Sequence, residues 1–134
     1  MTATRPALLA IFELGGYPNF MPLYQRLGFD ATLVNSLRKA RNWLKKHRPV
    51  VIVAEYNFQS DFRDRSSNLE TLMAILQKMP EVGLIAFYQP NQRARFEALR
   101  ERFPTIVGLA YPITETALEA RLQAMLSGGE DLLQ

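Results

Sequence analysis

Two glutamates that follow apolar runs are the residues of this chain with the clearest potential for chemistry. Glu55 closes the run Pro49–Glu55 (PVVIVAE), and Glu13 follows the run Ala7–Phe12 (ALLAIF). Such runs are typical of buried parallel strands, whose carboxyl ends form the edge where open α/β sheets bind ligands. Glu13 and Glu55 should therefore lie close together, either as oxygen ligands for Mg²⁺ or as two solvated loop carboxylates. We favour the solvated pair, because no further ligand is evident.

The composition excludes several other kinds of site. The sequence of 134 residues contains no cysteine and one histidine, His47. Disulfides, thiol catalysis and thiolate metal sites are excluded, as is any mechanism that needs two imidazoles. The net charge of +3 is compatible with nucleic acid binding but does not indicate it.

The elements that must position the two glutamates alternate between strand and helix along the whole chain. Apolar runs predict strands at 7–12, 29–34, 49–55, 82–88 and 106–111. Helical spacing of apolar residues predicts helices at 20–27, 35–47, 67–79, 92–103 and 116–126. Capping boxes, Ser67–Glu70 and Thr116–Glu119, mark the starts of the third and the last helix. Five strand–helix units predict one α/β domain over residues 1–134, with a parallel sheet covered on both faces.

In the length and order of these units, the chain resembles a response-regulator receiver domain from about Ala7 to Leu126. The resemblance implies a flavodoxin-like (CheY-like) fold with strand order 2-1-3-4-5. It places Glu55 where receivers carry the phosphoacceptor aspartate. Glu13 matches one member of the acidic pair that binds the divalent metal, and Asn57 matches the residue whose carbonyl oxygen completes that metal site.

The switch positions of the family are altered in this sequence. Phe87 and Tyr88 end the fourth strand, where receivers carry threonine or serine, and Tyr111-Pro112 stands where receivers carry Lys-Pro. A glutamate carboxylate is displaced by one methylene, and without the lysine the charge of a transferring phosphoryl group would be poorly met. The resemblance therefore implies a pseudo-receiver that is not phosphorylated, is not an enzyme and needs no cofactor, with residual Mg²⁺ binding left open.

The segment from Tyr56 to Ser66 places aromatic residues beside arginines. Its chemistry-bearing residues are Tyr56, Phe58, Phe62, Arg63 and Arg65. This composition is found in interaction hot spots, and the alternative is that the rings fold back over the sheet edge. We leave both interpretations open for this predicted interaction loop.

The resemblance also implies a partner surface, since receivers commonly use the face of the fourth helix, fifth strand and fifth helix. Mixed charges on the helix at 92–103 suit a homodimer or a protein partner at this face. We expect a cytoplasmic protein, because Met1–Pro6 lacks a signal-peptide core and no apolar run spans a membrane. We do not expect nucleic acid as a partner.

Two other functions stay open as alternatives. The first is a metal-, nucleotide- or flavin-binding protein that uses Glu13, Glu55, Asp61 and Asp64 at the carboxyl edge. Gly15-Gly16 could be a phosphate-binding loop there, but we favour a turn at this position. The second is a nucleic-acid accessory protein that uses Arg63 and Arg65.

Overall fold

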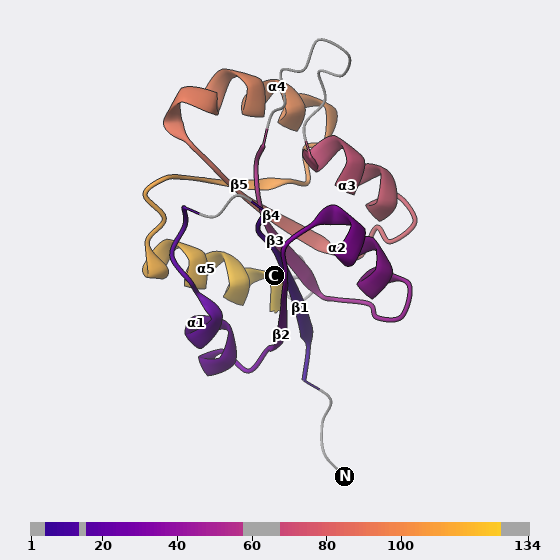
Figure 1. Ribbon diagram of the computed structural model, residues 1–134. Helices are drawn as coiled ribbons and strands as arrows, with labels where there is room; N and C mark the ends of the chain where they lie inside the picture. The colour runs from indigo at the N-terminus through magenta and orange to yellow at the C-terminus, as the bar shows by residue number, and fades with distance from the viewer. Residues whose placement is uncertain (1–4, 14–15, 58–67, 127–134) are drawn as a thin grey trace, which may run out of the picture.

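Strands and helices alternate along the chain in the structure, a computed structural model that describes residues 5–13, 16–57 and 68–126. The strands are β1 (Ala7–Ile11), β2 (Asp30–Val34), β3 (Val51–Glu55), β4 (Gly83–Tyr88) and β5 (Val107–Ala110). The helices are α1 (Met21–Arg26), α2 (Leu37–Leu44), α3 (Asn68–Leu76), α4 (Arg93–Arg102) and α5 (Glu115–Leu126), with a 3₁₀ turn at Pro90–Gln92. The strands form one parallel sheet in the order β2-β1-β3-β4-β5, which confirms the predicted fold and topology (Figure 1).

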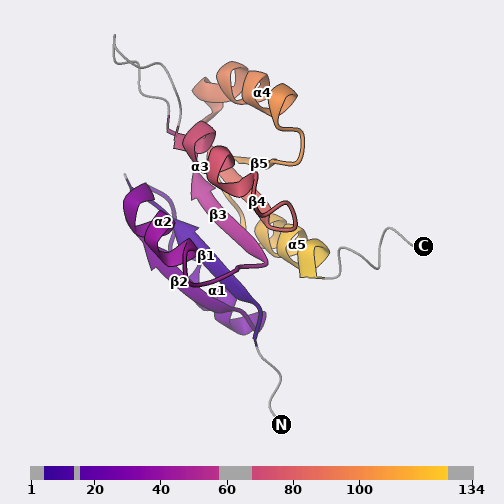
Figure 2. The ribbon, with the colours of Figure 1, turned by 90° about the vertical axis from the view of Figure 1, so that its right-hand side faces the viewer.

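The helices cover both faces of the sheet and divide the core in two. Helices α1 and α5 lie on one face, and α2, α3 and α4 lie on the other (Figure 2). Alternate residues of each strand point to opposite faces, so Val51 and Val53 pack under α1 and α5 while Ile52 and Ala54 pack under the other helices. Strand β3 is buried along its whole length, as its run of β-branched residues predicted.

The register of the sheet brings the predicted site residues to one edge. Ala54 on β3 is aligned with Ile11 on β1, and Glu55 is aligned with Phe87 on β4. The segment that follows β1 therefore begins beside the last residue of β3. No helix in the described part of the chain is long and apolar enough to cross a membrane.

The bounds of some helices differ from the sequence prediction. Helix α5 begins at Glu115, and the hydroxyl of Thr114 accepts a hydrogen bond of 3.1 Å from the N–H of Ala117. The predicted capping box at Thr116 is therefore wrong, because Thr114 caps the helix and Thr116 lies inside it. Helix α2 ends at Leu44, short of residue 47, and Ser67 of the other predicted box lies outside the described residues.

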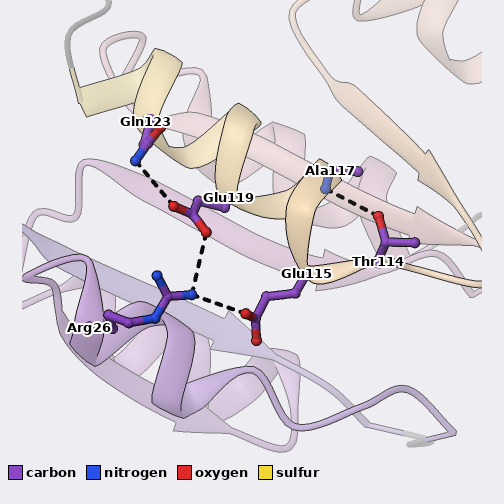
Figure 3. A network of polar contacts seen from close by, with 6 residues as sticks. All are labelled: Arg26, Thr114, Glu115, Ala117, Glu119 and Gln123. Carbon is purple, nitrogen blue, oxygen red and sulfur yellow. Dashed lines mark hydrogen bonds and ion pairs between the residues drawn. The ribbon is translucent and has the colours of Figure 1, made fainter.

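An ion-pair network joins the first helix to the last on the face that they share (Figure 3). The guanidinium of Arg26 on α1 lies 3.0 Å from the carboxylate of Glu115 and 3.3 Å from that of Glu119 on α5. Gln123 donates a further hydrogen bond of 3.3 Å to Glu119. Exposed pairs of this kind contribute about 1 kcal/mol or less each, so the network adds little to stability.

Candidate functional site

The carboxylate of Glu55 is buried at the carboxyl end of β3. Glu55 is 2% exposed, and it is the one charged residue in the core of the described chain. The main-chain N–H of Glu13 donates a hydrogen bond to this carboxylate, while the side chain of Glu13 is exposed. The two residues are neighbours, as predicted, but the expectation of two solvated carboxylates is wrong for Glu55. The register explains the contact, because β1 ends beside β3 and brings the N–H of Glu13 to the carboxylate.

Aromatic rings surround this end of the sheet and form a cluster that we call the aromatic cover. Its members are Phe12, Tyr17, Phe20, Phe87 and Tyr111. The Tyr17 ring lies 5.4 Å from that of Phe87 and 5.9 Å from that of Tyr111, between centroids. Phe87, which is fully buried, is the register partner of Glu55. Ring pairs at these distances contribute about 0.5–1.5 kcal/mol each beyond the area that they bury.

The hydroxyl of Tyr17 is a polar group in the aromatic cover whose pKa is affected by the charge of Glu55. Gln89, which follows β4, donates a hydrogen bond of 3.3 Å to this hydroxyl. Burial raises the pKa of Tyr17 above its usual value, the bond from Gln89 lowers it, and the negative charge of Glu55 raises it further. Tyr17 therefore stays protonated at neutral pH beside the buried carboxylate.

Asn68, the first residue of α3, forms hydrogen bonds with the main chain at the end of β3. Its side-chain N–H₂ donates to the carbonyl oxygen of Glu55 at 2.6 Å, and its side-chain oxygen accepts from the N–H of Asn57 at 2.6 Å. The N–H of Asn68 donates to the carbonyl oxygen of Asn57 at 3.0 Å. The carbonyl that the resemblance assigns to a metal thus already accepts a hydrogen bond from the start of α3.

The residues at the predicted switch positions do not form one group. Phe87 points into the core under α1 and α5, whereas Tyr88 points to the opposite face and stacks on Phe96 with centroids 4.3 Å apart. Tyr111 is 41% exposed at the end of β5, its N–H donates to the carbonyl of Tyr88, and its peptide bond to Pro112 is cis. Phe87 and Tyr111 are linked instead through the ring of Tyr17.

Most of the predicted interaction loop, residues 58–67, lies outside the described residues. This segment contains Phe58, Asp61, Phe62, Arg63, Asp64 and Arg65. Tyr56 is described and points inward, with 3% of its surface exposed and its ring 5.5 Å from that of Phe96. Tyr56 therefore belongs to the core between β3 and α4.

No group of three or more histidine, aspartate or glutamate side chains is placed to hold a metal within residues 5–13, 16–57 and 68–126. The residues that the resemblance offers as metal ligands, Glu13, Glu55 and Asn57, are divided between an exposed side chain, a buried one and a backbone carbonyl. Of these three residues, Glu55 is 2% exposed.

Sequence reasoning missed Phe12, Tyr17 and Asn68 as parts of this site. Gly16, just before Tyr17, has a positive φ of 87°, a conformation that glycine adopts readily. One signal was present, because any residue between the first strand and the first helix must lie at the carboxyl edge. An aromatic residue there, close to the aromatic end of the fourth strand, indicated contact between the two loops.

Comparisons with known proteins agree with this architecture. No protein-family model and no curated protein matches the sequence. Among solved structures, a signal receiver domain from Vibrio parahaemolyticus has a TM-score of 0.69 at 18% identity, covering 98% of each chain. A response regulator receiver protein from Sinorhizobium medicae WSM419 has a TM-score of 0.66 at 18% identity, covering 92% of this chain and 93% of its own. A sensor protein from Polaromonas sp. JS666 has a TM-score of 0.69 at 17% identity, covering 93% of this chain and 98% of its own.

The chain therefore has the fold of response-regulator receiver domains. This likeness at low sequence identity concerns the path of the backbone.

Proposed function

We propose that the protein is a receiver-like signalling module that acts by binding a protein partner and is not phosphorylated. In this proposal it is not an enzyme and needs no cofactor. The receiver fold supports the general class, and the solved structures that share it include receiver domains of signalling proteins. The burial of Glu55 beside Phe87 is the single observation that carries the finer proposal.

The chemistry of phosphoryl transfer explains why this burial matters. An acceptor carboxylate must meet the donor in line and must share the developing charge with a cation. Glu55 is enclosed in the core, its carboxylate already accepts the N–H of Glu13, and Tyr111 stands where the resemblance expects a lysine. These features favour a fixed carboxylate over a reacting one.

The proposed partner surface is the face made by α4, β5 and α5. Tyr111 presents an exposed ring at the end of β5, and Arg93 on α4 lies 6.0 Å from the ring of Tyr88 nearby. Arg100 pairs with Glu97 at 3.3 Å, which leaves Glu101 without a pair among the described residues. A surface with both charge signs can complement a second copy of itself, so a homodimer is the first partner that we propose.

Incubation with a small phosphodonor and Mg²⁺, followed by intact-mass analysis, tests the proposal. We expect no mass change, while a phosphorylatable receiver treated in parallel gains one phosphoryl group. A stable phosphoryl group mapped to Glu55, or to Asp61 or Asp64, would contradict it. Sedimentation of the unmodified protein then measures the dimer, and Tyr111→Glu should dissociate it if this face forms the interface.

A further inference from the structure

A pocket of about 220 Å³ lies between α1 and the edge strand β2, beside the aromatic cover. Its walls combine aromatic rings and aliphatic side chains with the amide of Asn19, and the aromatic residues are Phe12, Tyr17, Phe20 and Tyr24. Leu33, on the edge strand, is 53% exposed, whereas Tyr24 is 2% exposed. The pocket therefore reaches from the surface of the edge strand to residues of the core.

Tyr24 brings a polar group without a partner into this apolar wall. Its hydroxyl has no hydrogen-bond partner among the described residues, although 98% of the residue surface is covered. No side-chain nitrogen or oxygen in the described chain is both fully buried and unpaired, so this hydroxyl must still reach solvent. Tyr24 lines the pocket, and we infer that the pocket is the route by which its hydroxyl reaches solvent. A nearly buried hydroxyl that bonds only solvent can form a stronger bond with a ligand that displaces the water.

The charges around the pocket determine what kind of ligand it can accept. No lysine, arginine, aspartate or glutamate lines it. An ionised ligand would lose its hydration there without gaining a counter-charge, so a neutral ligand is favoured. Burial raises the pKa of Tyr24 above its usual value, so the hydroxyl keeps its proton and can donate or accept one hydrogen bond.

The size of the pocket limits the ligand to about one ring. A cavity of about 150 Å³ is enough to hold benzene in a protein core, whereas pockets for drug-sized ligands begin near about 300 Å³. The four aromatic rings on the walls favour a planar ligand that they can contact edge-on or face-on. A protein partner is less suited, because the unpaired polar group lies on a residue that is almost wholly covered.

We propose that this pocket binds a small neutral aromatic molecule, of the size of phenol, whose polar substituent hydrogen bonds to the hydroxyl of Tyr24. The pocket lies at α1 and β2, whereas the proposed partner face is on α4, β5 and α5; Tyr17 lines the pocket and contacts Tyr111 at the edge of that face. The tests of the pocket do not involve Glu55. A negative result for ligand binding would therefore not contradict the proposed function, which has separate tests.

Titration of the full chain with phenol and with toluene, followed by two-dimensional NMR, tests this inference. Phenol should shift the amide signals of Ala10, Tyr24 and Leu33, which border the pocket. Tyr24→Phe should weaken phenol binding by roughly three- to tenfold, the worth of one hydrogen bond, and should leave toluene binding unchanged. Equal affinity of phenol for the wild type and for Tyr24→Phe would overturn the role of the hydroxyl.

A matched pair of surface variants tests the location. Leu33→Glu places a charge at the mouth of the pocket, and Leu126→Glu makes the same change at a second exposed leucine on α5. Leu33→Glu should weaken both ligands at least tenfold, and Leu126→Glu should leave them unchanged. Equal effects of the two variants, or no shift with either ligand at millimolar concentration, would overturn the site.

Discussion

Glu55 and Phe87 stand side by side on β3 and β4, in parallel register and both enclosed by the protein. One carries a carboxylate and the other a ring that contacts three further rings of the aromatic cover. The charge at the end of the central strand is thus held in an apolar setting, with the N–H of Glu13 as a donor. Because the carboxylate and the ring are packed together, substitutions at or near this pair should change the stability of the protein.

Removing the Phe87 ring should leave a cavity beside the buried carboxylate. Phe87→Ala should lower the free energy of unfolding by about 3–5 kcal/mol, and Phe87→Leu by a smaller amount, as urea unfolding followed by circular dichroism would measure. Leu126→Ala, at an exposed position, should change it by about 0.5 kcal/mol or less. A cost of Phe87→Ala no greater than that of the control would contradict the packing described for the aromatic cover.

Two glycines on neighbouring strands differ in what an added methyl group would meet. A Cβ at Gly108 would clash with the ring of Phe96, which is buried and stacked on Tyr88. A Cβ at Gly83 would lie 2.8 Å from the sulfur of Met125, at the flexible end of its side chain. Gly108→Ala should therefore cost about 1–3 kcal/mol of stability and Gly83→Ala clearly less. Thermal unfolding of the two variants makes the comparison, and the reverse order would refute it.

The Asn68 side chain should contribute measurably to stability because it bonds two main-chain groups. Asn68→Ala leaves the carbonyl of Glu55 and the N–H of Asn57 without these partners and should cost about 1–3 kcal/mol. Asn35→Ala, at an exposed residue before α2, serves as the matched control and should be near neutral. Hydrogen exchange at Asn57 should also become faster in Asn68→Ala, and an unchanged rate would argue against the bond.

The raised pKa of Tyr17 predicts a loss of stability at high pH. An unfolded tyrosine ionises near pH 10, and the folded Tyr17 ionises only above that, chiefly because it is buried. As the pH rises past about 10, the unfolded chain loses this proton first, so the free energy of unfolding falls. Tyr17→Phe should make that fall shallower between about pH 9 and about pH 11. An identical slope in the wild type and the variant would show that Tyr17 is not buried as described.

The sheet could be predicted from the sequence because each strand has its own short apolar run, and five such runs alternate with helical patterns. Every residue from Val51 to Ala54 is apolar, and a run of that kind fits one place in an α/β sheet. The helix start at Thr114 was missed because two threonines, Thr114 and Thr116, can each cap a helix, and only the position of the chain after β5 selects between them.

The candidate site was less predictable, because its contacts join loops that are far apart in sequence. The Tyr17 ring meets those of Phe87 and Tyr111 only after three strands have aligned. Likewise, Glu55 was correctly placed at the carboxyl edge, but its burial depends on rings that other loops supply. Patterns of residue spacing predict which edge a residue reaches, and they do not predict what covers it.

The bridge from Arg26 to Glu115 and Glu119 has a consequence for how the chain matures during synthesis. Its partners are separated by 89 and 93 residues, and α5 is the last described element to be made. Before α5 packs on the sheet, the face under it leaves Ile85 and Phe87 uncovered, whereas the opposite face is covered by α2, α3 and α4. A chain at that stage has one covered face and one exposed apolar face, so the docking of α5 should lower its tendency to aggregate.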